Sequence, residues 1–219
     1  MAEETLEKTV VKKEAEPMLS KRRKRIVVDP LNEDNPITVQ VLGICSALAI
    51  TIKMEPTIIM GVSVIAVVAC SNLIISLIRN YVPNRIRIIV QLSIVATLVT
   101  LVSEVLKAYN YPMYKVLGAF VGLIITNCIV MGRLEAFAMG NKPYDSVLDG
   151  LGSGMGYAWI ILTVAFFREL FGSGTVLNFQ VLGDAYVKNS IMVDSVGAFM
   201  ILGFIIWVQR ALTGYVESH

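Results

Sequence analysis

Two cysteines lie well inside separate apolar stretches of this 219-residue sequence. Cys45 belongs to LGICSALAI (residues 42–50), and Cys128 belongs to ITNCIVMGR (residues 125–133). Cysteine thiolates are soft ligands that bind zinc or the iron of iron–sulfur clusters. Cysteine is also among the most often buried residue types and can act as a small apolar side chain. The two residues are therefore candidates either for metal ligation or for packing.

The sequence limits the metal sites that this chain could complete by itself. The single histidine is His219, so neither histidine ligands nor histidine acid–base chemistry is expected. Two thiolates supply half of a four-coordinate site. If Cys45 and Cys128 are ligands, a related partner chain with its own pair would complete a Cys₄ set, which suits an iron–sulfur cluster or zinc. The third cysteine, Cys70, lies off this pattern and is interpreted as a packing residue.

The composition places these cysteines in a membrane protein. Hydrophobic residues make up 55% of the chain and charged residues 16%, and the mean hydropathy is +0.67. The apolar residues form runs whose length is close to that of a membrane-spanning helix. The fold class that we predict is an all-α polytopic membrane protein, without the disulfides of a secreted domain. Six spans are expected, at residues 37–52, 57–78, 88–106, 116–132, 151–171 and 195–212.

The start of the chain is polar. Residues 1–34 mix acidic and basic side chains with few aromatics, which predicts a disordered cytoplasmic tail before a transmembrane domain at 35–219. The run KRRKR (residues 21–25) precedes the first span, where basic residues more often orient a helix at an anionic leaflet than bind nucleic acid. A signal peptide is not expected, so the first span directs insertion itself.

The charge distribution predicts the orientation in the membrane. Six spans put both termini on one side, and with the amino terminus inside, fourteen of the nineteen Lys and Arg residues fall on the inner side. Both termini are therefore expected to be cytoplasmic. The loop RNYVPNRIR (residues 79–87), where Pro83 stops a helix, is the clearest inner marker. The longest inner loop is expected at residues 133–157.

The order of the spans predicts an inverted repeat. The spans at 37–52 and 116–132 are the shortest, and each carries one of the two candidate cysteines. They open two three-span halves, at about 35–110 and 111–214. Because each half has an odd number of spans, the halves are inserted in opposite orientations. Short or interrupted segments at equivalent positions of such halves mark functional sites, and the two cysteines occupy such positions.

Other polar residues in the spans have simpler interpretations. Asn72 and Asn127 are expected to form hydrogen bonds between helices. Glu104 and the neighbouring pair Arg168 and Glu169 fall near the ends of spans, so no carboxylate is expected at the midplane and any ion path is expected to be shared with other chains.

The glycine-rich stretch GLGSGMG (residues 150–156) has the composition of a phosphate-binding loop but not its context. No strand precedes it and no lysine follows at the spacing of a Walker motif. Small residues let membrane helices approach closely. We therefore expect these glycines to pack helices.

Five stretches closely resemble a known family of membrane subunits. The family comprises the D and E subunits of the sodium-translocating NADH:quinone reductase, the Nqr complex, and their counterparts in the Rnf ferredoxin:NAD reductase. RIIVQLSIVATLV followed by EVLKAY, within residues 87–109, looks like the Nqr D-type version. The stretches are NPITVQVLGICSALA (35–49), RIIVQLSIVATLV (87–99), GLIITNCIVMGRLEAFAMG (122–140), LDGLGSGMGY (148–157) and FFRELFGSG (166–174).

The resemblance implies a specific site. In the family, short first and fourth helices meet near the midplane, and a sister subunit of the same fold is inserted in the opposite orientation. Two cysteines from each sister hold one [2Fe–2S] cluster. The family's LG-x-C and TNC motifs match Cys45 and Cys128, which the resemblance therefore identifies as cluster ligands. Cys70 matches no ligand motif.

The resemblance also implies a function and partners. The family's Nqr members belong to a six-subunit complex, A to F, of the bacterial inner membrane, and the E subunit is the closest partner of the D-type subunit. The complex passes electrons from NADH to ubiquinone and exports sodium ions from the cytoplasm to the periplasm. This chain would relay electrons, whereas the NADH, flavin and quinone sites belong mainly to other subunits.

Three alternatives stay open. The E subunit of an Rnf-type ferredoxin:NAD reductase shares the cysteine-bearing segments. A small secondary transporter without metal would have a midplane cavity lined by Ser46, Thr126 and Asn127. A purely structural assembly subunit would tolerate substitution of both candidate cysteines.

Overall fold

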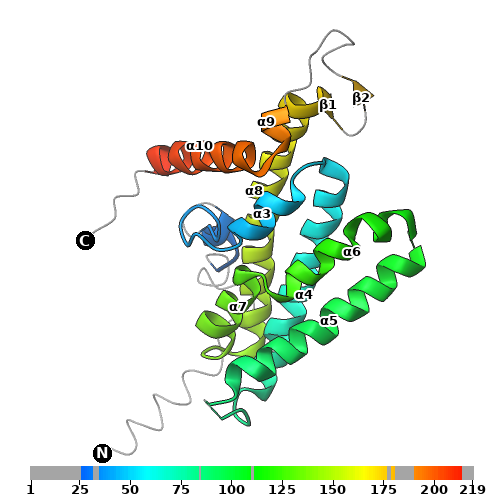
Figure 1. Ribbon diagram of the computed structural model, residues 1–219. Helices are drawn as coiled ribbons and strands as arrows, with labels where there is room; N and C mark the ends of the chain where they lie inside the picture. Colours follow the sequence, from blue (N-terminus) through cyan, green and yellow to red (C-terminus); the bar gives the residue numbers. More distant parts are fainter. Residues whose placement is uncertain are drawn as a thin grey trace, which may run out of the picture.

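The computed structural model describes six parts of the chain (Figure 1). They are residues 26–31, 35–83, 85–109, 111–176, 179–180 and 190–213. In chain order, the elements are η1 (Asp29–Leu31), α3 (Ile44–Ile50), α4 (Met54–Ile78), α5 (Arg87–Tyr109), α6 (Tyr111–Ile125), α7 (Cys128–Arg133), the π-helix η2 (Leu134–Ala138), α8 (Pro143–Ser173), β1 (Thr175–Val176), β2 (Phe179–Gln180), α9 (Ser190–Val193) and α10 (Ser195–Thr213).

Three of these helices, α4, α5 and α8, are long and apolar enough to cross a membrane. A shorter apolar helix, Ser195–Ala211, lies within α10. The only strands in the described residues are β1 and β2, which form one short antiparallel pair. The expectation of a helical membrane protein is confirmed in this form, whereas six spans in an inverted repeat remain a prediction.

The central feature of the fold is the packing of α4 against α8 (Figure 1). Gly61 faces Ala158, Ile65 faces Gly154, and Ala69 faces Gly150. The numbers rise by four along one helix as they fall by four along the other, so the two helices are antiparallel and one face of each is in contact.

The glycine-rich stretch at residues 150–156 supplies part of the surface of α8 that contacts α4. A Cβ atom at Gly150 would lie 3.0 Å from the Cα of Ala69, and one at Gly154 would lie 3.0 Å from the Cα of Ile65. Gly152 and Gly156 face the other way, toward the backbone of Val27 and Pro30. The expectation that these glycines pack helices is confirmed. Gly150 and Gly154 pack α8 against α4, whereas Gly152 and Gly156 pack it against the segment at residues 26–31.

Part of the expected disordered tail is structured. Residues 26–28 form a helical turn, η1 follows, and this segment lies against α8. The Nδ2 of Asn35 donates a hydrogen bond of 3.2 Å to the carbonyl oxygen of Gly156, which fixes the end of the segment. Residues 1–25 and 32–34 lie outside the described residues.

The expected inner loop at 133–157 is wrong. The helix α7 continues through η2, and α8 begins at Pro143, so residues 143–157 are helical. Proline is favoured in the first turn of a helix. Glycines lower helix propensity, but here the packing that they permit outweighs this cost.

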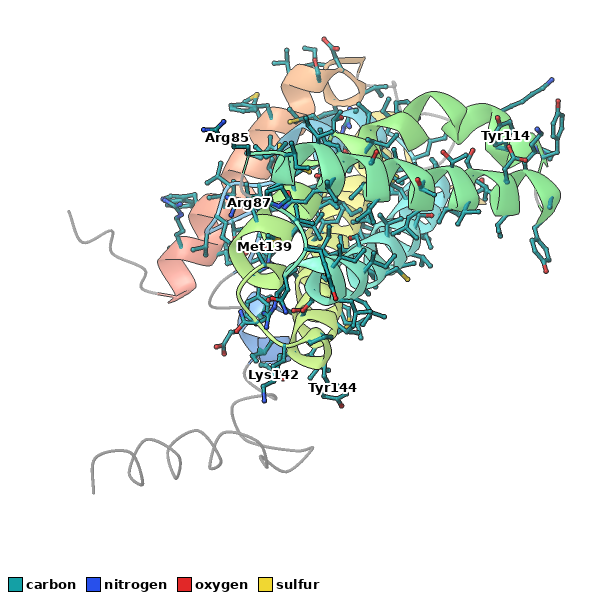
Figure 2. All side chains as sticks on the ribbon, turned by 90° about the horizontal axis from the view of Figure 1, so that it is seen from below. Arg85, Arg87, Tyr114, Met139, Lys142 and Tyr144 are labelled. Carbon is teal, nitrogen blue, oxygen red and sulfur yellow. The ribbon has the colours of Figure 1, made fainter. Side chains whose placement is uncertain are left out.

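The remaining helices surround the central pair unevenly. In Figure 1, α5 and α6 form a hairpin that leans away from α8, and α10 runs across α8. Figure 2 looks onto the end of the molecule where α5 and α8 begin, and it shows Arg85, Arg87 and Lys142 at that end. Three basic residues that the sequence assigns to the inner side thus share one end of the molecule.

Candidate functional site

Cys45 lies at the start of a short helix that follows a break in the chain. Residues 36–43 form turns instead of the first half of a continuous span, and α3 contains only seven residues. Gly43 has a φ of 82°, a left-handed conformation that glycine adopts without strain. Cys45 is the second residue of α3, and its side chain is an exposed free thiol.

Cys128 has the same placement in the second half of the chain. The expected fourth span is interrupted at Thr126 and Asn127, and Cys128 is the first residue of α7. Asn127 has an extended backbone, and its Oδ1 accepts a hydrogen bond of 3.3 Å from the backbone N of Ile129. This is an N-cap, which stabilises the start of a helix. Cys128 is also an exposed free thiol.

The two breaks meet inside the protein. A Cβ atom at Gly43 would lie 2.9 Å from Cε2 of Tyr157 and 3.4 Å from Oδ1 of Asn127. Gly43 is two residues before Cys45, and Asn127 directly precedes Cys128. The structure therefore brings together the two chain breaks that carry the candidate ligands, as the repeat hypothesis expects.

The donor set fits a half-site for a metal cluster. Both thiols are exposed and free, and each lies at the start of a short helix that follows a chain break. Within the described residues, no group of three or more His, Cys, Asp or Glu residues gathers that could hold a metal ion. Cys45 and Cys128 are thus candidate ligands of an incomplete site in this part of the chain.

Cys70 differs from the other two cysteines. It lies in the interior of α4, away from any break, and its side chain is exposed. Its expected packing role is therefore not seen within this chain.

The two asparagines behave differently. The Nδ2 of Asn72 donates a hydrogen bond of 3.0 Å to the carbonyl oxygen of Ser146 on α8, which confirms the expected contact between helices. Asn127 instead caps its own helix, because the break leaves the first N–H groups of α7 without backbone partners. The buried Asn127 side chain also interacts with Tyr157 on α8, so its expected interhelical bond stays a prediction.

A buried arginine holds the end of the helix that carries Cys45. Arg168 is only 2% exposed. Its Nη1 donates to the carbonyl oxygen of Leu48 (3.1 Å) and to Oγ1 of Thr51 (2.8 Å) at the end of α3. Its Nε and Nη2 donate to the carbonyl oxygens of Met192 (3.3 Å), Val193 (2.6 Å) and Asp194 (3.2 Å), where α9 ends. A cation suits carbonyl groups at helix ends.

Glu169 completes this support at the start of the next helix. Its Oε2 accepts a hydrogen bond of 2.7 Å from the backbone N of Met54, the first residue of α4. A carboxylate suits a helix N-terminus for the same electrostatic reason. The sequence located Arg168 and Glu169 near the end of a span but missed this role. The signal that could have revealed it was a charged pair inside an apolar run.

A buried ion pair joins α7 to α8. The Nε of Arg133 donates to Oδ2 of Asp149 at 3.0 Å, and its Nη2 pairs with Oδ1. Both residues are buried, with Asp149 only 1% exposed. Sequence reasoning missed this pair because it assigned Asp149 to a loop.

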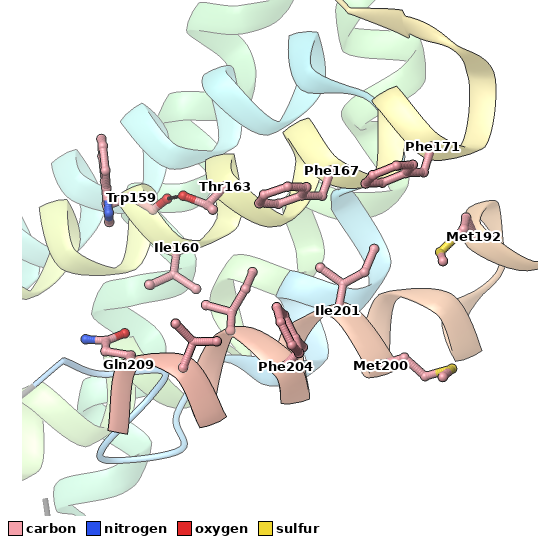
Figure 3. A pocket seen from close by; sticks show the side chains of 12 residues that line it. Trp159, Ile160, Thr163, Phe167, Phe171, Met192, Met200, Ile201, Phe204 and Gln209 are labelled. Atoms are coloured by element: carbon pink, nitrogen blue, oxygen red, sulfur yellow. Dashed lines mark hydrogen bonds between the residues drawn. The ribbon is translucent and has the colours of Figure 1, made fainter. Parts of the chain in front are cut away.

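One groove in the described part of the chain is not lined by either Cys45 or Cys128. It has a volume of about 790 Å³ and lies between α8 and α10 (Figure 3). Its lining is mainly apolar and aromatic, including Trp159, Phe167 and Phe204. Ser46, Thr126 and Asn127, which the transporter alternative requires, are not among the lining residues.

Comparisons with known proteins show the family of the chain. Residues 23–206 match the family model described as "Rnf-Nqr subunit, membrane protein". The chain is 53% identical over 198 residues to the D subunit of the Na(+)-translocating NADH-quinone reductase of Pasteurella multocida, covering 88% of this chain and 95% of that protein. It is 50% identical over 198 residues to the protein of the same name from Photobacterium profundum, covering 88% and 94%. The chain therefore belongs to the Rnf-Nqr family of membrane subunits.

Proposed function

We propose that this chain is the D subunit of a Na⁺-translocating NADH-quinone reductase. Two relatives that carry this name are 53% and 50% identical to the chain and are covered over almost their full length. As such a subunit, the chain acts within a multi-subunit membrane enzyme and is not catalytic alone. Its closest partner in this proposal is the sister E subunit.

Cys45 and Cys128 supply two ligands of a [2Fe–2S] cluster, and the sister subunit supplies the other two. The observation that carries this assignment is the meeting of two chain breaks, each followed by a short helix whose first or second residue is an exposed cysteine. When bound, the cluster would accept and release one electron at a time. It would thus link electron entry from NADH with electron delivery toward ubiquinone, while the flavin, NADH and quinone sites lie in other subunits.

The residues of this chain have defined tasks in the proposal. Gly43 and Asn127 interrupt the spans, so that α3 and α7 begin inside the protein with Cys45 and Cys128 in their first turns. The exposure of both thiols leaves them open to a partner chain. Buried Arg168 binds the end of α3, and the buried ion pair of Arg133 with Asp149 joins α7 to α8, so both short helices are held in place.

The proposed topology is six spans in two inverted halves within the bacterial inner membrane, with both termini in the cytoplasm. The second helices of the two halves, α4 and α8, pack in antiparallel directions, as an inverted repeat requires. Arg85, Arg87 and Lys142 share one end of the molecule (Figure 2), which supports a cytoplasmic assignment for that end. Sodium export to the periplasm belongs to the whole complex.

Electron paramagnetic resonance tests the cluster assignment. The whole complex is purified anaerobically, its iron is measured, and the reduced sample is compared for wild type, Cys45→Ala, Cys128→Ala and the matched control Cys70→Ala. We expect one iron–sulfur signal and its iron to disappear in the first two variants and to persist in the control. Unchanged iron and spectra in assembled Cys45→Ala and Cys128→Ala complexes would overturn the assignment and favour a transporter or structural role.

A further inference from the structure

Tyr157 is a fully buried polar residue that lies between the two cysteine-bearing breaks. It belongs to α8 and has 0% exposure. Its hydroxyl forms a hydrogen bond of 2.7 Å with Oγ of Ser46. Ser46 directly follows Cys45, so this bond connects the middle of α8 to the start of α3.

The ring of Tyr157 also limits how closely the first break can approach α8. The absent Cβ of Gly43 would lie 2.9 Å from Cε2 and 3.3 Å from Cδ2 of this ring. The same point is 3.4 Å from Oδ1 of Asn127, the cap of the helix that carries Cys128. The Tyr157 ring and the Asn127 side chain therefore both lie on the side of Gly43 to which a Cβ would point.

The hydroxyl contact continues into the backbone of the break. Oγ of Ser46 donates a hydrogen bond of 2.9 Å to the carbonyl oxygen of Gly43 and also bonds Tyr157. A buried hydroxyl without a partner is costly, so each member of this chain of contacts fixes the next. The rotation of the first turn of α3 is thus set by a side chain from another helix.

We propose that Tyr157 is a positioning residue that sets the spacing and orientation of Cys45 relative to Cys128. This inference rests on the proposed function, because the spacing matters for a shared cluster. Tyr157 itself touches no reacting group. Its ring packs against Gly43 next to the Asn127 side chain, and its hydroxyl fixes the start of α3 through Ser46.

The test compares substitutions that remove the hydroxyl, the ring or its partner. The complex is purified with Tyr157→Phe, Tyr157→Leu, Ser46→Ala or the double variant Tyr157→Phe/Ser46→Ala. Tyr144→Phe is the matched control, because Tyr144 lies on the same helix but is exposed. The readouts are the g values of the reduced cluster, its midpoint potential, and the rates at which a maleimide labels Cys45 and Cys128 in complex from iron-starved cells. Cys70 is the internal reference for labelling.

Tyr157→Phe removes the hydrogen bond to Ser46, so we expect a change on the order of fivefold in the reduction equilibrium constant. A tenfold change would correspond to about 59 mV for one electron. Ser46→Ala should produce a larger change in the same direction, because it also removes the hydrogen bond to the carbonyl oxygen of Gly43. The double variant should change no more than Ser46→Ala, because that substitution already removes the contact with Tyr157. Tyr157→Leu should abolish or broaden the signal and alter the labelling of both cysteines, but not of Cys70.

Two different failures can be distinguished. If Cys45→Ala and Cys128→Ala remove the signal but all Tyr157 variants keep wild-type g values, potential and labelling rates, the positioning role is wrong and the proposed function stands. If the cysteine variants keep the signal, the proposed function fails. The labelling rates of Cys45 and Cys128 then still decide whether Tyr157 positions the two breaks.

Discussion

At the corner between α3 and α4, charged side chains of α8 bind the backbone, whereas at the corner between η2 and α8 the binding side chains come from α4. Arg168 and Glu169 serve the first corner and are almost completely buried. At the second corner, the carbonyl oxygen of Asn141 accepts a hydrogen bond of 2.8 Å from Oγ of Ser76 and another from Arg79. Each corner follows one of the two cysteine-bearing breaks.

If the chain is the inverted repeat that we propose, its two halves keep one plan without similar sequences. At both corners, side chains in or next to the long helix of one proposed half bind the corner that follows the break of the other. The groups held at both corners are mainly backbone atoms, which any sequence provides. The supporting side chains can therefore differ in type, and an inverted repeat can persist although the halves share almost no identity.

The two corners differ in how deeply their supporting side chains are buried and in how many hydrogen bonds these side chains donate. Arg168 donates to five acceptors in a dry environment, so removing its charge leaves several carbonyl groups without partners. Arg79 is only half-buried, so water can replace it more easily. We therefore expect the α3–α4 corner to be the more sensitive of the two.

The largest effect is expected for Arg168→Leu. Loss of a buried hydrogen-bonded charge typically costs about 3 to 5 kcal/mol, and here α3 and α9 lose their common support. Thermal unfolding of the chain in detergent should show this loss, and the complex should assemble poorly. Arg168→Lys should restore only part of the stability, since an ammonium lacks the planar fork of donors that reaches the acceptors on both α3 and α9. If Arg168→Leu had wild-type stability, the α3–α4 corner would not be the more sensitive of the two.

The second-largest effect is expected for Gly150→Val in the interface between α4 and α8. Gly150→Val would push a branched side chain against the backbone of Ala69, where even a Cβ lies at 3.0 Å. Overpacking of this kind costs about 1 to 3 kcal/mol. The matched control is Gly118→Ala, because a Cβ at Gly118 meets nothing within 4 Å. Its stability in the same detergent assay should be equal to or slightly above wild type, since alanine favours a helix. Equal effects of both substitutions would argue against close packing of α4 on α8.

These contacts also show where sequence reasoning succeeded. The apolar runs revealed the long helices, and the positions of Cys45 and Cys128 in two short spans indicated where the chain is interrupted. Both inferences depend on local composition and length, which the sequence records directly.

The contacts that sequence reasoning missed depend on partners far along the chain. Arg168 binds a helix end about 120 residues away, and Asp149 became part of a helix only because the glycines beside it pack against α4 and the segment before α3. Glycine looks like a loop residue when read alone, and only tertiary packing overrides that preference. The cap role of Asn127 was hidden for the same reason, because the break was expected only as a short span.

A smaller effect is expected at the cap of the second break. Asn127→Ala removes the side chain that accepts from the N–H of Ile129, and loss of such a cap costs about 1 kcal/mol. Because the cap precedes Cys128, we expect faster hydrogen exchange at the start of α7 and little change in α3. Asn127→Asp should retain the cap, since aspartate is an equally good N-cap residue. Equal acceleration in α3 and α7 would instead mean that the two breaks open together.

The smallest effect is expected for Ser76→Ala, which removes one contact at the corner between η2 and α8. This substitution removes one neutral hydrogen bond of 2.8 Å to Asn141, while the donation from Arg79 to the same oxygen remains. A net loss of about 0.5 to 1.5 kcal/mol is typical for one such bond, and the remaining donor should keep the loss near the lower end. The double variant Ser76→Ala/Arg79→Met should lose more than the sum of the single variants, because only then is the carbonyl of Asn141 left without either side-chain donor. Strict additivity of the two stability losses in thermal unfolding would show that Ser76 and Arg79 act independently. The Asn72 contact with Ser146 would then be the contact that holds the corner between η2 and α8.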